Sequence, residues 1–320
     1  MKRHYLPLLL ITQALAHPSH DASVHGEDLD LQDAHRDTPA ENEVEIKIQG
    51  DLRIIDSNGI PDHDTGRFPG KENPNSIREQ DYHFVMPVAP EPANAPIEVE
   101  RQPFGVALNG VVFDPGTAEY YRNDRRSEWN YEALSGEIDL GLDEHHGHVQ
   151  PTGAYHYHGL PTGLFERLSG GQKKMTQIGW AADGFPIYGL YGHEDPDDLE
   201  SPVVELRSSY ELRDGRRNGG AGTPRGDHDG TFTLDYEYVA GLGDLDECNG
   251  RVGVTPEFPN GTYYYVLTAD YPFIPRLLRG EPDKSFERRG PPPGGHGGGP
   301  GGRPPHPFGP PHGPRGPRGR

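Results

Sequence analysis

The amino-acid sequence predicts a mainly β protein: a single β-sandwich-like domain with long loops, flanked by two segments that lack the composition of a folded core. Short stretches rich in β-branched and aromatic residues recur between residues 44 and 280, separated by turns of Gly, Pro, Asn and Asp. Convincing helical periodicity is scarce in this part. Only 32% of the 320 residues are hydrophobic, and 44 Gly and 34 Pro are present, so part of the chain lies outside any core.

Residues 1–16 are predicted to be a signal peptide. Lys2 and Arg3 precede a short apolar run, and Ala14 and Ala16 form the small-x-small pattern after which signal peptidase cuts. The run is shorter than the roughly 20 residues that a membrane-spanning helix needs, and no later stretch is suitable either. We therefore expect cleavage near Ala16 and an extracytoplasmic location, secreted or periplasmic.

The segments on either side of the domain are expected to be disordered. Residues 17–43 are acidic, nearly free of aromatic residues and without periodicity, which predicts a tether. Residues 281–320 are rich in Gly, Pro and Arg without a regular period, which predicts a tail.

Within the domain, residues 44–55 (VEIKIQGDLRII) alternate as a strand does, and residues 104–113 (FGVALNGVVF) and 261–268 (GTYYYVLT) have strand composition. Residues 161–171 (PTGLFERLSGG) predict one short helix that ends at the pair Gly170-Gly171.

Charge and cysteine content exclude some classes of protein. A net charge of −20 argues against nucleic-acid binding, which needs clustered Lys and Arg. The single cysteine, Cys248, cannot close an internal disulfide, so stability must come from core packing, a metal or both. No sequence feature identifies a protein partner.

An internal repeat relates residues 142–159 to residues 245–268. Both copies read Leu-Asp-Glu-x-x-Gly-x-Val and then Gly-x-Tyr-x-Tyr, so we expect the same turn and strand in both. The first copy has histidines where the second has other residues: the pairs are His145 and Cys248, His146 and Asn249, His148 and Arg251, His156 and Tyr264, and His158 and Val266. The scaffold therefore does not itself require histidine at these positions.

The histidines of the first copy predict a metal site. In a strand, His156 and His158 share one face, while Tyr155 and Tyr157 share the other. His148 is the expected third ligand, and imidazole ligands suit a copper or zinc ion. Further candidate ligands are His145, His146, His63 in the turn NGIPDH, and Asp183 in ADGFPIYG, whose carboxylate could instead orient a ligating ring.

The stretch GAYHYHGLP (residues 153–161) is the motif of the YHYH domain family, which the chain resembles from about residue 44 to residue 280. Further resemblance lies in PFGVALNGVVFDPG, GWAADGFPIYGLYG and DLDECNGRVGVTPEFPNGTYYYVLTADYP. The resemblance implies one domain and an extracytoplasmic setting. It implies no particular activity.

Three function classes remain open on the sequence alone. The first is a metal-binding protein. The second is a metal-dependent enzyme of unspecified substrate, with Asp143, Glu144 or Asp183 as general base. The third is a structural or surface-interaction module whose histidines are hydrogen-bonded parts of the fold.

Overall fold

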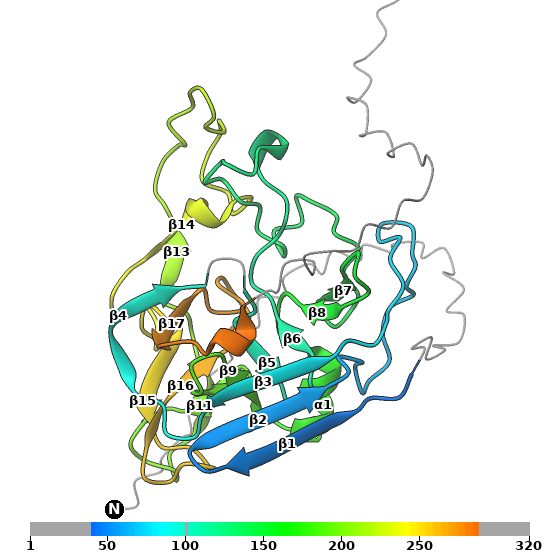
Figure 1. The fold of residues 1–320 in the computed structure, drawn as a ribbon. Coiled ribbons are helices and arrows are strands. Elements are labelled where there is room, and N and C mark those ends of the chain that lie inside the picture. Colours follow the sequence, from blue (N-terminus) through cyan, green and yellow to red (C-terminus); the bar gives the residue numbers. More distant parts are fainter. Residues whose placement is uncertain (1–39, 100–101, 288–320) are drawn as a thin grey trace, which may run out of the picture. The chain divides into compact units, whose positions relative to one another are not determined.

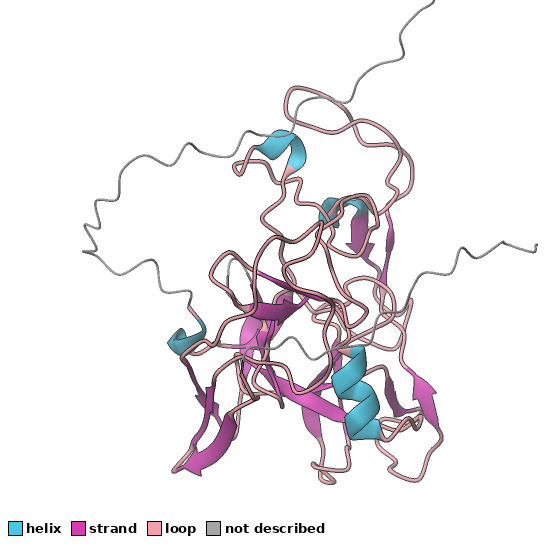
Figure 2. Cartoon of the chain, turned by 90° about the vertical axis from the view of Figure 1, so that its right-hand side faces the viewer, coloured by secondary structure: helices cyan, strands magenta, loops and turns pink. Residues whose placement is uncertain are grey.

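A computed structural model of the chain describes residues 40–99 and 102–287, which belong to one folded unit. The predicted signal peptide and most of the two predicted disordered segments lie outside these ranges. Strands make up 31% and helices 7% of the described residues, which confirms the predicted mainly β class (Figures 1 and 2). No helix in the described part is long and apolar enough to cross a membrane.

The largest sheet has eight strands in the order β15-β16-β10-β9-β5-β6-β8-β7. Neighbouring strands are antiparallel, except that β6 pairs with β8 and β10 pairs with β16 in parallel. The bounds are β5 (Gly105–Ala107), β6 (Val112–Phe113), β7 (Gly147–Val149), β8 (Tyr155–Tyr157), β9 (Gln177–Ala181), β10 (Pro186–Tyr188), β15 (Gly250–Gly253) and β16 (Thr262–Val266).

A three-stranded antiparallel sheet packs over this large sheet, which gives the predicted sandwich-like core (Figure 1). It consists of β1 (Val44–Gln49), β2 (Leu52–Ser57) and β3 (Tyr82–Pro87). Ile55 and Met86 from this sheet share one hydrophobic core with Phe113, Tyr157 and Tyr265 from the large sheet.

Smaller elements complete the domain. The strand pairs are β4 (Pro92–Glu98) with β17 (Leu277–Gly280), β11 (Tyr191–His193) with β12 (Val203–Glu205), and β13 (Tyr210–Leu212) with β14 (Tyr236–Tyr238). The predicted helix is α1 (Thr162–Ser169), and it ends as expected at Gly170, which is left-handed with φ 65°. The 3-10 helices are η1 (Tyr121–Asn123), η2 (Thr233–Asp235) and η3 (Lys284–Phe286).

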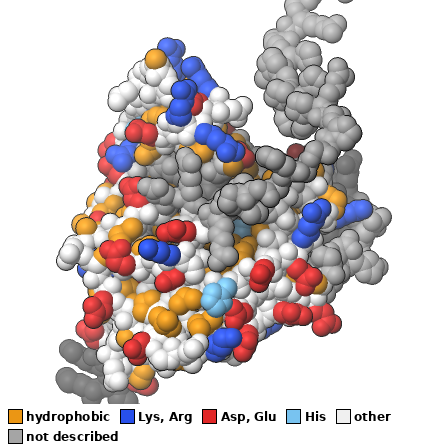
Figure 3. All heavy atoms as spheres, in the orientation of Figure 1, with side chains coloured by type: hydrophobic (Ala, Val, Ile, Leu, Met, Phe, Trp, Pro, Cys, Tyr) orange, Lys and Arg blue, Asp and Glu red, His pale blue; other side chains and the backbone are white. Residues whose placement is uncertain are grey.

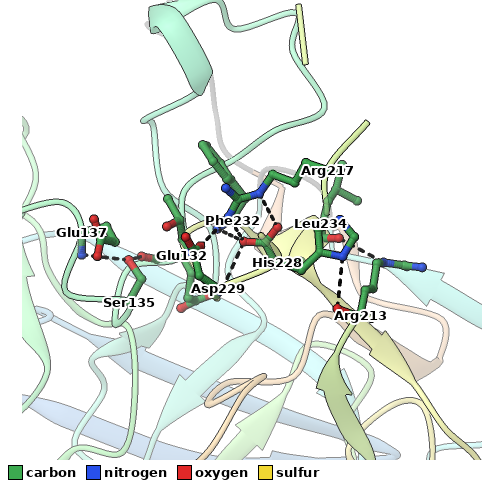
Figure 4. Close-up of polar contacts among 12 residues, drawn as sticks. Glu132, Ser135, Glu137, Arg213, Arg217, His228, Asp229, Phe232 and Leu234 are labelled. Atoms are coloured by element: carbon green, nitrogen blue, oxygen red, sulfur yellow. Dashed lines mark hydrogen bonds and ion pairs between the residues drawn. The ribbon is translucent and has the colours of Figure 1, made fainter. Parts of the chain in front are cut away.

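A buried ion pair holds the long segment around β13 and β14 (Figure 4). The Arg217 guanidinium donates to both carboxylate oxygens of Asp235, at 2.7 and 2.5 Å, and also bonds Asp229. Phe232 lies under the same guanidinium at 5.0 Å. Asp235 is fully buried, so the arginine supplies the charge that a carboxylate in that position needs.

The large sheet consists of two halves that repeat each other. One half is β5-β6-β8-β7 and the other is β9-β10-β16-β15, and each joins two hairpins through a parallel pairing. The halves meet where β5 pairs with β9, with Val106 opposite Trp180. On either side of that pair, Gly105 faces Ala181 and Ala107 faces Gly179, so the register has an approximate two-fold axis.

The first hairpin of each half has the same pattern, Gly-x-Ala-x-Asn/Asp-Gly, beginning at Gly105 and at Gly179. The turn residues Gly110 and Gly184 have φ values of 81° and 93°, which favour glycine. Their amides donate to Ala107 O and Ala181 O, at 2.8 and 2.9 Å. The internal repeat is therefore longer than the sequence comparison indicated, since that comparison found only the second hairpins.

The folded part extends beyond both predicted domain limits, residues 44 and 280. Asn42 donates from its side chain to Ile60 O and Asn109 O, at 2.6 and 2.7 Å. At the other end, η3 buries Phe286 against Phe84, with ring centroids 4.5 Å apart. Asn42 in the predicted tether and Phe286 in the predicted tail therefore contact the folded domain.

Candidate metal centre

A carboxylate-centred turn places the first histidine of the site. Asp143 Oδ1 accepts hydrogen bonds from the amides of His145 (2.9 Å) and Gly147 (3.0 Å), while its Oδ2 accepts from the Tyr155 hydroxyl (2.7 Å). His146 occupies the left-handed region, with φ 56°. The chain then enters β7, where His148 is the central residue.

The hairpin β7–β8 brings the other two histidines to the same face of the sheet. His148 lies directly opposite His156 in the antiparallel register. His158 comes just after β8, and its amide donates to His146 O at 2.8 Å. Tyr155 and Tyr157 point to the opposite face and are fully buried in the main core, as strand alternation predicts.

The three rings converge through their Nε2 atoms. The Nε2 atom of His158 lies 3.0 Å from that of His156 and 3.1 Å from that of His148. The ring centroids are 4.6 to 4.9 Å apart. His156 and His158 are 2% and 3% exposed, and His148 is half-buried. Among the described residues, this is the one group of three or more His, Cys, Asp or Glu with metal-binding proximity.

Backbone carbonyls fix the orientation of two of these rings. His148 Nδ1 lies 2.7 Å from Leu140 O, and His156 Nδ1 lies 3.3 Å from Ala154 O. A carbonyl oxygen only accepts, so each Nδ1 carries the proton and each neutral ring presents an Nε2 lone pair to the centre. Burial lowers the pKa of His148, which favours the neutral ring that a metal requires.

Two of the three ligand spacings fit a metal ion, and all three candidate ligand atoms lie within 4.8 Å of one another. Zinc–imidazole bonds of 2.0 to 2.1 Å in tetrahedral geometry place ligand nitrogens about 3.3 Å apart. The observed Nε2 separations of 3.0 and 3.1 Å are close to that value. At this distance His158 Nε2 either donates a proton to one of the neighbouring Nε2 atoms or, with its proton on Nδ1, can share a cation with both.

The other two histidines of the turn lie outside this cluster. His145 Nδ1 lies 2.7 Å from Thr162 Oγ1 and accepts from the Gly163 amide at 3.1 Å, which ties the turn to the start of α1. His146 Nδ1 lies 2.9 Å from Leu160 O. Both rings therefore hold the chain that surrounds the centre.

His63 and Asp183 also lie elsewhere. His63 packs against the His145 ring, and its Nε2 lies 2.7 Å from the Tyr157 hydroxyl, on the core face of the sheet. Asp183 belongs to the other half, where it accepts from the Tyr265 hydroxyl at 2.5 Å and from the Gly280 amide at 2.9 Å. Burial raises the pKa of Asp183 to about 6.

The carboxylates considered as a general base have other partners too. Asp143 organises the turn, and the exposed Glu144 lies beside His145 Nε2 at 3.6 Å. Cys248 is buried in the second half, and burial raises the pKa of its thiol to about 12, so it stays protonated.

Sequence reasoning missed Asp114. It follows β6, is 5% exposed, and accepts from Gln150 Nε2 at 3.3 Å. Val112 lies opposite His156, so Asp114, two residues further, shares the face of the histidines. Its charge and that of Glu119 favour a cation near His148. The motif VVFDPG holds this residue, but only the pairing of β6 with β8 reveals its position.

The second half shows the same backbone without the histidines, as the sequence repeat predicted. Asp246 Oδ1 accepts from the amides of Cys248 (2.9 Å) and Gly250 (3.0 Å), and Asn249 has φ 53°. Arg251 lies opposite Tyr264 and donates to its hydroxyl at 2.6 Å.

The face that carries three histidines in the first half is a small hydrophobic core in the second. That core contains Tyr188, Tyr264 and Val266, which correspond to Asp114, His156 and His158. The polar centre of the first half therefore replaces apolar packing at equivalent positions.

Comparison with known proteins agrees with the resemblance seen in the sequence. The family model of the YHYH protein matches residues 83–280, which include both halves of the large sheet. Neither the curated proteins nor the solved structures gave a match. The matched range covers more than half of the chain, and we conclude that the chain belongs to the YHYH protein family.

Proposed function

We propose that this domain binds one copper(II) or zinc ion through the Nε2 atoms of His148, His156 and His158. The observation that carries the proposal is the convergence of these atoms, with separations of 3.0 and 3.1 Å. The carbonyls of Leu140 and Ala154 support it, because they leave the Nε2 lone pairs available.

The second half of the sheet argues against a purely structural role for the three histidines. Its equivalent positions hold Arg251, Tyr264 and Val266. Tyr264 and Val266 pack in a hydrophobic cluster, and Arg251 donates one hydrogen bond to Tyr264, so the same strand pair forms without histidines. Three imidazoles at these positions make less apolar contact than the side chains of the second half, and they need a shared proton or cation. Their presence therefore favours a ligand-binding role.

The ligand set favours copper(II) or zinc over other metals. Neutral imidazoles suit both ions, whereas the soft sulfur ligands that select copper(I) are absent from the three-histidine group. Magnesium and calcium prefer oxygen ligands.

The proposal includes a location outside the cytoplasm, which rests on the signal-peptide pattern of residues 1–16. A fusion of residues 1–25 to a reporter should be secreted and processed after Ala16. Retention of an unprocessed fusion in the cytoplasm would contradict this part of the proposal.

The test of metal binding compares the full chain, purified without a histidine tag, with two variants. The scaffold variant His148→Arg/His156→Tyr/His158→Val installs the residues of the second half, and His228→Ala removes a histidine whose Nδ1 lies near Arg213 O instead. After chelation and titration with zinc or copper(II), the wild type and His228→Ala should bind one ion more tightly than micromolar. The scaffold variant should lose this ion while remaining folded.

Binding weaker than micromolar in the wild type, or equal binding in the scaffold variant, would refute the metal proposal. The histidines would then form a structural or surface-interaction module.

A second candidate function is a metal-dependent enzyme. Three protein ligands leave a position for water on zinc, and the buried Asp114 supplies a carboxylate on the same face. Azide added to the copper(II) form should change its electron paramagnetic resonance spectrum if that position is open. An unchanged spectrum would indicate a closed site and would leave only the binding role.

A further inference from the structure

The three-stranded sheet has one covered edge and one open edge. On the β3 side, the Val85 amide donates to Ser285 Oγ at 2.8 Å, and this hydroxyl donates to Val85 O at 3.2 Å, so η3 covers the backbone there. On the other side, β1 pairs with β2 alone, and no other described residue bonds the backbone of Val44–Gln49 (Figure 1). An edge strand with unpaired amides and carbonyls is a template for pairing with another strand.

The free backbone groups of β1 belong to its apolar residues. The Asn58 amide donates to Glu43 O at 3.0 Å, and hydrogen-bonded positions alternate along an antiparallel pair. The odd-numbered residues of β1 therefore direct their amides and carbonyls toward β2. Val44, Ile46 and Ile48 direct theirs toward the open edge.

Two of these apolar residues are exposed at the rim of the sandwich. Ile46 and Ile48 lie opposite Ile55 and Arg53, which are 0% and 6% exposed, so all four share the inner face of the sheet. Ile46 and Ile48 are nevertheless 41% and 58% exposed, so the core that covers β2 does not extend over β1. A strand added at the open edge would remove part of this apolar surface from water.

The outer face of β1 carries one charge of each sign. Glu45 and Lys47 are both exposed, and Lys47 Nζ lies 2.9 Å from Asp56 and 3.4 Å from Glu45. In the space-filling view, hydrophobic side chains and side chains of both charges lie over the region of β1, β2 and β3 (Figure 3). A strand that carries an acidic and a basic residue on one face can complement the charges of an antiparallel copy of itself.

Two symmetric registers pair most of β1 with the β1 of a second copy, because a two-fold axis normal to the sheet places one residue opposite itself. An axis at Lys47 places two ammonium groups directly opposite each other, which is destabilising. An axis at Ile46 instead places Ile46 opposite itself and Val44 opposite Ile48, all on the inner face. On the outer face, the same axis places Glu45 opposite Lys47. The charges therefore select the axis at Ile46.

We propose that the chain forms a symmetric dimer in which the β1 strands of two copies pair antiparallel about Ile46. The outward amides and carbonyls of Val44, Ile46 and Ile48 then bond those of the partner, and Glu45 and Lys47 form an ion pair on each side of the axis. The three-stranded sheets of the two copies become one continuous sheet. The inference goes beyond the proposed metal binding and does not depend on it, since His148, His156 and His158 belong to the large sheet and its loops.

Sedimentation velocity of the chain from residue 17 onward, at protein concentrations from about 1 to 500 µM, tests for the dimer. EDTA removes metal ions that could join two copies through exposed histidines. We expect a reversible dimer with a Kd of roughly 1–100 µM, because an interface one strand wide is smaller than the about 1,200 Å² that stable complexes bury. A monomer at every concentration would overturn the proposal and would leave the edge to a different partner.

Charge exchange tests the ion pairs. Glu45→Lys or Lys47→Glu alone places like charges opposite each other on both sides of the axis and should weaken the dimer about tenfold. The exchange variant Glu45→Lys/Lys47→Glu restores opposite charges and should recover the wild-type Kd to within about threefold. Lys71→Glu changes an exposed lysine outside the sheet and should leave the Kd unchanged. Equal weakening in the exchange variant and the single variants, or in Lys71→Glu, would overturn the proposal.

Cysteine cross-linking tests the register. Two copies of Ile46→Cys would have Cα atoms about 5.5 Å apart at the axis, within the range for a disulfide. Two copies of Ile48→Cys would have Cα atoms roughly 13 Å apart, because Ile48 lies opposite the partner's Val44, four residues from the partner's Ile48. Cys248 is buried and does not compete.

Under mild oxidation, Ile46→Cys should form a covalent dimer and Ile48→Cys should form little. Ile48 is the more exposed of the two residues, so random collisions would favour the opposite order. Faster cross-linking of Ile48→Cys, or cross-linking of neither variant, would overturn the proposal.

Discussion

The duplicated turn allows a matched pair of substitutions, Asp143→Ala and Asp246→Ala, to separate stability from metal binding. Asp143 accepts from two turn amides, from the Tyr155 hydroxyl and from the Gly66 amide at 3.1 Å. Asp246 accepts from two equivalent amides and from the Tyr263 hydroxyl at 3.0 Å. The amides of Gly147, Cys248 and Gly250 and both tyrosine hydroxyls belong to buried residues, where water does not readily replace the carboxylate, so each substitution should cost about 2–4 kcal/mol of unfolding free energy.

The expected effects on the metal differ. Asp143→Ala releases the turn that delivers His148 to the centre, and loss of such a supporting contact typically lowers metal affinity about 10- to 100-fold. Asp246→Ala disturbs only the second half and should leave affinity within about twofold. Urea unfolding of the metal-free protein measures the first quantity, and zinc titration measures the second. Equal loss of affinity in both variants, or unchanged affinity in Asp143→Ala, would refute the positioning role of this turn.

Three further predictions concern charge. Burial raises the pKa of Asp183 to about 6, above its unfolded value of 3.8. Its contribution to stability is therefore complete below pH 3.8 and is lost as the pH rises through 6. Urea unfolding from pH 4 to 7 should show this loss of unfolding free energy in the wild type and not in Asp183→Asn. Arg217→Ala leaves the buried Asp235 without the Arg217 guanidinium and should lower the unfolding free energy by about 3–5 kcal/mol. Thermal unfolding measures this loss, and an unchanged melting temperature would mean that the ion pair does not stabilise the fold. Protons compete with metal at the imidazoles, so zinc affinity should fall as the pH drops through about 6.5. Because burial lowers the pKa of His148, that ring should stay unprotonated below this value. A zinc affinity that does not change from pH 5 to 8 would contradict histidine ligation.

The sequence predicts much of the fold class and the repeat for identifiable physical reasons. Strand alternation alone places His156 and His158 on one face, with Tyr155 and Tyr157 on the other. The left-handed glycine after Ser169 marks the end of α1, because few other residues adopt that conformation.

Other features depend on pairings between distant segments. Asp114 reaches the histidine face only because β6 pairs in parallel with β8, and no local pattern encodes that pairing. The repeat of β5–β6 in β9–β10 is carried by small residues and one Asn/Asp exchange, at Asn109 and Asp183, so composition alone hides it. The hydrogen bond between His63 and Tyr157 likewise joins residues far apart in the chain.

The pairing of β5 with β9 makes the two halves dependent on each other. Each contributes one strand to a shared ladder at the centre of the sheet, so separating them would expose two rows of unpaired backbone groups. The halves are thus not separate folding units, even though each repeats the other. On the face that carries the histidines in the first half, the second half supplies apolar packing at Tyr264 and Val266. The first half holds three polar rings there and lacks an equivalent apolar contribution to stability. On this face, apolar packing in the second half stabilises the sheet, whereas the equivalent positions of the first half can carry different polar chemistry.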